Sequence, residues 1–135
     1  MTKKGRPFLD TNVLIYAFAS NDRRTAVAEA LLARGGAVGV QNLNEFASVA
    51  QRKMKMPWRD IQRALAAIRV LCPSPVPVTL KIHEAAVEIA TRHQFQIYDA
   101  LVLAAAIGSS CPILYSEDLQ HGQVIGPVTV QNPFL

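Results

Sequence analysis

The sequence is poor in cysteine, aromatic residues and charge. Its two cysteines, Cys72 and Cys111, form no CxxC or Cys/His spacing, so we expect free buried thiols. Charged residues make up 18% of the chain and hydrophobic residues 50%, a balance from which we expect a folded rather than a disordered protein. No apolar run reaches the roughly 18 residues that span a bilayer, and no signal-peptide core is present. We expect a cytoplasmic protein without membrane attachment, folded as one domain over residues 1–135.

Several catalytic motifs are also missing. The three histidines, His83, His93 and His121, show no paired spacing such as HExxH, which argues against a histidine metal centre. Ser116 has no accompanying histidine motif, so a hydrogen bond to a metal ligand or a phosphate is a better role for it than nucleophilic attack. Trp58 follows a proline beside basic residues; packing in a core or dimer interface is favoured over stacking on a base.

Positive charge is in mild excess. The net charge of +4 and the isoelectric point near 9.4 suit an anionic partner such as nucleic acid. Solvated helix faces explain the same charges equally well. The basic residues gather in one short region and around the first acidic motif: Arg52, Lys53, Lys55, Arg59, Arg63 and Arg69, and Lys3, Lys4, Arg6, Arg23 and Arg24.

Hydrophobic patterning predicts strands that alternate with helices. Such alternation indicates an α/β domain with a mainly parallel sheet. In the helix expected over 23–34, Val27, Ala28, Ala30 and Leu31 are predicted to face inward. Residues 72–78 are too rich in proline for a helix and form a connection or a short edge strand. The expected strands are 7–9, 37–40, 112–115 and 126–130, and the expected helices are 13–19, 23–34, 41–54, 57–71, 79–93 and 100–107.

The stretch from Ala100 to Ile107 is apolar on every side, and Gly108 provides a stop signal. A helix of this kind has to be buried. Asp99 is the only charge in the stretch from Gln96 to Gly108, and it lies at the entrance of the helix. It either caps the helix, stabilised by free backbone N–H groups and the helix dipole, or is placed there to bind a cation.

Four acidic positions are expected at one edge of the sheet. Asp10 and the Ser116–Glu117–Asp118 group each follow a predicted strand, while Asp99 and Glu45 lie at or near helix starts. Carboxylates about 4–5 Å apart repel by a few kcal/mol per pair, so a cation is needed to keep them ionised. Mg²⁺ and Mn²⁺ prefer carboxylate oxygens, and such a cluster suits hydrolysis of a phosphodiester.

Four segments of the chain together resemble the PIN domain, and most closely the VapC-type ribonuclease toxins of bacterial toxin–antitoxin pairs. Each motif is weak by itself, but the ordered set covers essentially the whole chain. The segments are Phe8–Leu14, Asn42–Phe46, Tyr98–Ala106 and Leu114–Leu119.

The resemblance implies a three-layer α/β/α nuclease domain with a central, mainly parallel sheet. It implies an endoribonuclease dependent on Mg²⁺ or Mn²⁺, with Asn12 and Ser116 as supporting polar residues. It also implies a homodimer that a cognate antitoxin inhibits. The implied metal-binding and catalytic acids are Asp10, Glu45, Asp99 and Asp118; Asp118 is preferred to its neighbour Glu117, although the choice between the two stays open.

Rival functions are less consistent with the residues present. A haloacid dehalogenase-type phosphatase needs a second Asp two residues after the first, where this chain has Asn12. A response-regulator receiver needs a Lys after its last core strands, and the last lysine here is Lys81. The alternative from another class is a non-catalytic module that binds nucleic acid or an antitoxin. The sequence does not encode which RNA is cut.

Overall fold

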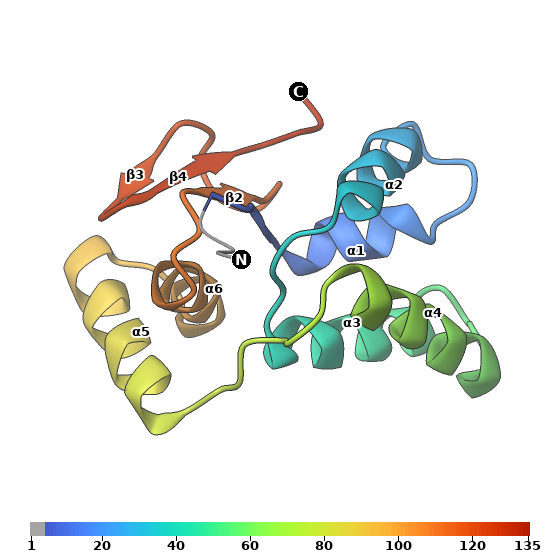
Figure 1. Ribbon diagram of the computed structural model, residues 1–135, viewed down its shortest axis with the longest axis horizontal. Helices are drawn as coiled ribbons and strands as arrows, with labels where there is room; N and C mark the ends of the chain where they lie inside the picture. The colour runs from blue at the N-terminus through green and yellow to red at the C-terminus, as the bar shows by residue number, and fades with distance from the viewer. Residues whose placement is uncertain (1–4) are drawn as a thin grey trace.

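A computed structural model describes residues 5–135, in which one strand is followed by six helices and then by three strands, so strands and helices alternate less than predicted (Figure 1). Lys3 and Lys4, part of the predicted basic flank, lie outside the described residues. In the described part, no helix is both long and apolar enough to cross a bilayer. The elements are β1 (Phe8–Leu9), α1 (Thr11–Ala17), α2 (Thr25–Arg34), α3 (Val40–Arg52), α4 (Trp58–Leu71), α5 (Leu80–His93), α6 (Ile97–Gly108), β2 (Ile113–Tyr115), β3 (Val124–Ile125) and β4 (Val128–Gln131).

The sheet has the strand order β1-β2-β4-β3. β1, β2 and β4 run parallel, with Leu9 opposite Tyr115 and Tyr115 opposite Gln131, and β3 pairs with β4 in the antiparallel sense. The carboxyl ends of β1 and β2 therefore lie side by side, and the residues that follow them, Asp10 and Ser116, leave the sheet at the same edge.

Successive residues of β1 face opposite sides of the sheet, as the pleat requires. Phe8 packs in a core with residues of α6, whereas Leu9 packs in a second core with residues of α1 to α4. Leu114 and Tyr115 of β2 divide in the same way. Figure 1 shows α5 and α6 on one side of the sheet and α1 to α4 on the other. The architecture is therefore the expected three-layer α/β/α arrangement with a mainly parallel sheet.

The α6 helix is buried along most of its length, as its all-apolar composition predicts. Ala100 and residues Val102–Ala106 are buried, and α5 packs along the helix. The N-cap residue is Gln96, whose side-chain oxygen accepts a hydrogen bond from the Tyr98 backbone N–H. Asp99 is the third residue of the helix, so it does not serve as the cap. Its carboxylate stays within the first turn, where the helix dipole stabilises negative charge.

Three details of the predicted pattern are wrong. Residues 37–40 do not form a strand: Ala37 and Gly39 make single bridges to Phe8 and Val76, and α3 already begins at Val40. Val27 and Ala30 are exposed, because α2 packs through Ala28, Leu31 and Leu32 instead. The short strand β3 was not predicted. Its hairpin with β4 turns at Gly126, where a φ of +55° favours glycine.

The two cysteines are placed as predicted, whereas the tryptophan is not in the core of this chain. Cys72 and Cys111 are free and buried, as predicted. Trp58 is 54% exposed on this chain rather than packed in its core.

Candidate metal-binding pocket

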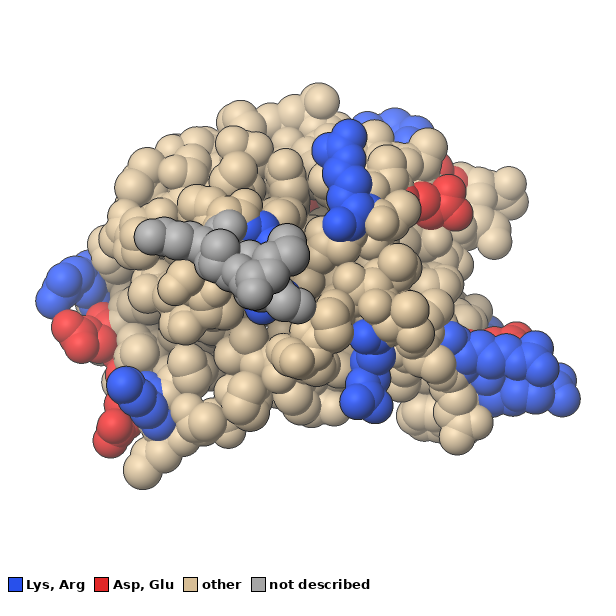
Figure 2. Space-filling model, in the orientation of Figure 1, with Lys and Arg blue, Asp and Glu red and all other residues tan. Residues whose placement is uncertain are grey.

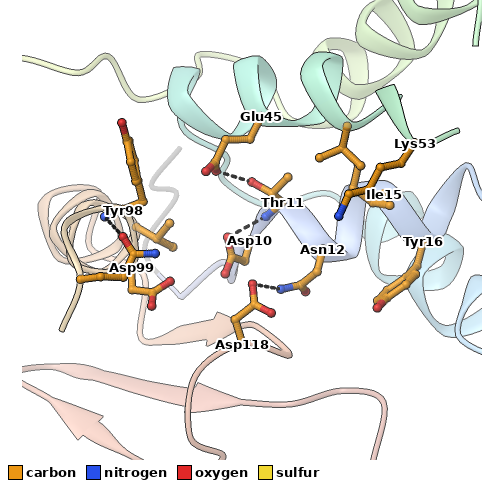
Figure 3. A pocket seen from close by; sticks show the side chains of 13 residues that line it. Asp10, Thr11, Asn12, Ile15, Tyr16, Glu45, Lys53, Tyr98, Asp99 and Asp118 are labelled. Carbon is orange, nitrogen blue, oxygen red and sulfur yellow. Dashed lines mark hydrogen bonds between the residues drawn. The ribbon is translucent and has the colours of Figure 1, made fainter. Parts of the chain in front are cut away.

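A pocket of about 340 Å³ opens at the carboxyl edge of β1 and β2, and all four predicted acids line it. Figure 3 shows the four carboxylates on different elements, directed toward a common space. Asp10 precedes α1, Glu45 lies on α3, Asp99 on α6 and Asp118 after β2. The structure thus brings together residues that lie more than 100 positions apart in the chain.

Asp10 is the buried member of the group, 5% exposed. It is the N-cap of α1 and accepts a hydrogen bond of 2.7 Å from the Thr11 backbone N–H and another of 2.7 Å from the Ser116 hydroxyl. Burial is the main cause that raises the pKa of Asp10 to about 6; the charges of Asp118 and Glu45 add to this effect, and the two hydrogen bonds oppose it. A nearby cation would stabilise the ionised form of a carboxylate in this environment.

Asp99 lies across the pocket, partly buried on the first turn of α6. Burial raises its pKa, and the charges of Asp118 and Glu45 raise it further. Both perturbed acids, Asp10 and Asp99, therefore feel the same two carboxylates. The four groups form one electrostatic cluster rather than four separate charges.

Glu45 is held by a chain of hydrogen bonds that begins at the start of α3. The Asn42 side chain accepts from the Gly39 backbone N–H at 2.9 Å and donates to the Thr11 hydroxyl at 3.0 Å. Thr11 in turn donates to Glu45 at 2.8 Å. Asn42, 2% exposed, also contacts Asp10 at 3.4 Å. A buried amide of this kind orients two acids at once.

Sequence reasoning missed Asn42 and Thr11 as site residues. Both lie within motifs that the sequence displays, three residues before Glu45 and directly after Asp10. Their side chains contact acids on other elements, and those contacts depend on how α1 and α3 pack. Lys53, a member of the predicted basic region, and Tyr98, which had no predicted role, also line the pocket.

The structure distinguishes the two neighbouring acids after β2. Asp118 lines the pocket and accepts a 3.3 Å hydrogen bond from the Asn12 side chain, while its backbone N–H donates to the Ser116 hydroxyl at 3.1 Å. Glu117 points elsewhere and forms a 2.8 Å ion pair with Arg24. Asn12 therefore contacts Asp118 and the Glu117 backbone, and Ser116 contacts Asp10 and the Asp118 backbone.

Glu117 belongs to a separate polar cluster beside the pocket. It accepts a hydrogen bond from the Tyr16 hydroxyl, and the Arg24 guanidinium lies 3.9 Å above the Tyr16 ring. Burial and the hydrogen bond to Glu117 raise the pKa of Tyr16 to about 12. Hydrogen bonds from Arg24 lower the pKa of Asp22 to about 2. The positive charge of Arg24 thus compensates the negative charge of Glu117 within this cluster.

The donor set fits a hard divalent cation. Carboxylate oxygens with water are the ligands that Mg²⁺ and Mn²⁺ prefer, and the pocket is open enough for solvent and a phosphate. Among residues 5–135, no three His, Cys, Asp or Glu side chains lie close enough together to hold one ion as they stand. Glu45, Asp10 and Asp118 each accept a hydrogen bond from a neighbouring side chain in this arrangement.

The acidic pocket lies at the carboxyl edge of the parallel strands, between helices of both layers. This is where α/β proteins bind their ligands, so the fold and the pocket together indicate an α/β protein with a polar binding site. The PIN domain family model matches residues 8–125, so the chain belongs to the PIN domain family. A comparison with curated proteins finds no match.

Two solved structures share the fold. VapC20 of Mycobacterium tuberculosis, described as a toxin that cleaves the sarcin–ricin loop, superposes with a TM-score of 0.69 at 23% identity, over 83% of this chain and 89% of its own. VapBC2 of Rickettsia felis, solved with a DNA fragment from its promoter, gives a TM-score of 0.67 at 19% identity, over 93% and 97% of the two chains. These likenesses extend the PIN fold over most of the chain.

Proposed function

We propose that this protein is an endoribonuclease that depends on Mg²⁺ or Mn²⁺ and acts as the toxin of a toxin–antitoxin pair. The observation that carries the proposal is the convergence of Asp10, Glu45, Asp99 and Asp118 on one pocket. The similar structures add support, since one is an RNA-cleaving toxin and the other a VapBC complex.

The residues of the pocket have different roles in the proposed reaction. Asp10, Glu45, Asp99 and Asp118 would hold the cation, which when bound supplies Lewis-acid stabilisation of charge on the scissile phosphate. Ser116 fixes the direction of the buried Asp10 carboxylate through its 2.7 Å hydrogen bond. Asn12 holds the Asp118 loop. Hydrolysis then yields two RNA fragments from one strand, with water as the attacking group.

The test is cleavage of RNA by the purified protein. We expect total RNA or a defined transcript to be cut in Mg²⁺ or Mn²⁺ and left intact in EDTA. Asp99→Asn and Asp10→Asn should each lower the cleavage rate more than about a hundredfold, because each removes a charged ligand while keeping the side-chain shape.

The matched control is Glu29→Gln, which removes one carboxylate from the exposed face of α2. It should cut RNA at the rate of the wild type. If wild-type protein free of any inhibitor cleaves no tRNA, rRNA or mRNA with either metal, the catalytic proposal is wrong. The alternative, a non-catalytic PIN-like module that binds nucleic acid or an antitoxin, then takes its place.

A toxin of this kind is also expected to have protein partners. We propose a cognate antitoxin that inhibits the nuclease, and a homodimer as the form that it binds. Induced expression should arrest growth of a bacterial host, and Asp99→Asn should relieve the arrest at equal protein level. Arrest that persists in Asp99→Asn would contradict toxicity through RNA cleavage.

A further inference from the structure

Lys53 is the one lysine or arginine among the described residues that line the acidic pocket. The other basic residues between Arg52 and Arg69 are exposed elsewhere, and Figure 2 shows blue side chains extending from the α3–α4 end of the molecule. Within residues 5–135, Lys53 forms no ion pair with a carboxylate. A cation that faces four acids without pairing with one is available to an anionic ligand.

The position of Lys53 follows from the geometry of α3. Glu45, Val49 and Lys53 all line the pocket and are spaced four residues apart, so they form one row along the helix. Lys53 lies about 12 Å along the helix axis from Glu45, given a rise of about 1.5 Å per residue. Figure 3 shows the Lys53 side chain directed into the pocket from this far end.

Tyr98 lies on the other side of the pocket, next to Asp99. Tyr98 is 51% exposed although the rest of α6 is largely buried, and it lines the pocket. Figure 3 shows Tyr98 and Lys53 on opposite sides of the acidic group. An exposed aromatic ring at the rim of a charged pocket is a surface on which an unpaired base can stack.

We propose that Lys53 and Tyr98 bind the RNA strand on either side of the cleaved linkage, an inference that rests on the proposed function. Lys53 contacts a backbone phosphate farther along the strand than the one at the acids, because about 12 Å separates it from Glu45 along the helix. Tyr98 stacks on a base at the opposite side. The two contacts hold the polyanion against a pocket whose acids otherwise repel it.

A purely structural role for Lys53 makes different predictions. Lys53 follows the last turn of α3, where a positive charge stabilises the helix dipole. That role affects stability but leaves the salt dependence of RNA binding unchanged. Salt dependence and the division between KM and kcat therefore separate the two roles.

The first experiment measures RNA binding without cleavage. The Asp10→Asn protein in Mg²⁺ is titrated into a short labelled oligoribonucleotide of mixed sequence, and into the same strand as a duplex. Adding Lys53→Gln should weaken binding of both probes about fivefold and reduce the slope of log K against log salt for the single strand by about 0.7. Adding Tyr98→Ala should weaken binding of the single strand about tenfold and of the duplex little, and Tyr98→Phe should restore it.

The chain offers a matched control for each change. Lys55→Gln removes an exposed lysine two residues from Lys53 that does not line the pocket, and Trp58→Ala removes an exposed aromatic ring from α4. Both should bind the single strand like the parent protein. Equal losses in Lys53→Gln and Lys55→Gln, or unchanged single-strand binding in Tyr98→Ala, would overturn the inference.

The second experiment uses the otherwise wild-type protein and separates the inference from the proposed function. Lys53→Gln should raise KM about fivefold with kcat unchanged. A loss of kcat at unchanged KM would overturn the assignment of Lys53 to substrate binding. If the wild type does not cleave RNA but binding still depends on Lys53 and Tyr98, the catalytic proposal fails and the binding inference stands.

Discussion

The Ser116 hydroxyl donates a 2.7 Å hydrogen bond to the Asp10 carboxylate, joining the end of β2 to the end of β1. Both residues are buried, and the two strands are parallel neighbours. The bond fixes the direction of Asp10, and the same hydroxyl accepts from the Asp118 backbone N–H. One serine thereby sets the relative positions of two of the four acids.

Ser116→Ala is expected to lower the free energy of unfolding by about 1–3 kcal/mol, because it removes the shorter of the two side-chain hydrogen bonds to the buried Asp10 carboxylate. Urea denaturation followed by circular dichroism measures the change. Ser48→Ala, at an exposed position of α3, is the control and should stay within about 0.5 kcal/mol of the wild type. Equal stability of Ser116→Ala and the wild type would mean that the bond does not hold Asp10.

The raised pKa of Asp10 predicts how stability depends on pH in the absence of divalent ions. Its pKa is about 6 in the folded protein, against 3.8 for an unperturbed aspartate carboxyl. The folded state therefore binds the proton more tightly, and stability is lost as the pH rises from about 4 through 6, by at most about 3 kcal/mol. Urea denaturation in EDTA across this range should show the loss in the wild type, whereas Asp10→Asn should lack this component. Parallel pH profiles would contradict the prediction.

Divalent ions should reverse that loss. Mg²⁺ or Mn²⁺ bound by the four carboxylates stabilises the folded state by mass action, by about 2.7 kcal/mol at a hundredfold excess over Kd. The Tm at pH 7 should rise with metal concentration in the wild type and respond much less in Asp10→Asn. A Tm shift of equal size in both proteins would place the ion away from Asp10.

Asn42 offers a test of the contacts that sequence reasoning missed. Asn42→Ala removes the donor to Thr11 and Asp10 and the acceptor for the Gly39 N–H, and should cost about 1–3 kcal/mol of stability. Asn44→Ala, exposed on the same helix, is the matched control. Urea denaturation of both variants gives the comparison, and equal losses would show that the buried network contributes nothing specific.

Asp118 and Glu117 can be separated directly. Asp118→Asn should reduce RNA cleavage more than about a hundredfold, because Asp118 lines the pocket. Glu117→Gln removes the ion pair with Arg24 and should cost about 1 kcal/mol of stability, with most activity retained. Cleavage rates and urea denaturation of the two variants decide the matter. The reverse ranking of cleavage rates would make Glu117 the fourth acid.

Local pattern was sufficient for most of the fold. The all-apolar run from Ala100 to Ile107 required a buried helix, and the prolines between Cys72 and Val78 required a break. The strand signals at 7–9, 112–115 and 126–130, with helices between the first two, correctly indicated a mainly parallel α/β sheet. The prediction of a strand over residues 37–40 was wrong. A short apolar run does not show whether the adjacent segment will form a continuous ladder of backbone hydrogen bonds with it or only single bridges.

The sequence by itself determined which acids are available and which two follow parallel strands, because strand ends and helix starts are local features. Only the tertiary structure shows that Asp118 lines the pocket while its neighbour Glu117 pairs with Arg24, since adjacent side chains on a turn point in different directions. It also decided that Thr11, Lys53 and Tyr98 line the pocket and that Asn42 supports it from behind. Their contacts arise from the packing of α1, α3 and α6 around the sheet edge, and no spacing within the chain specifies that distance.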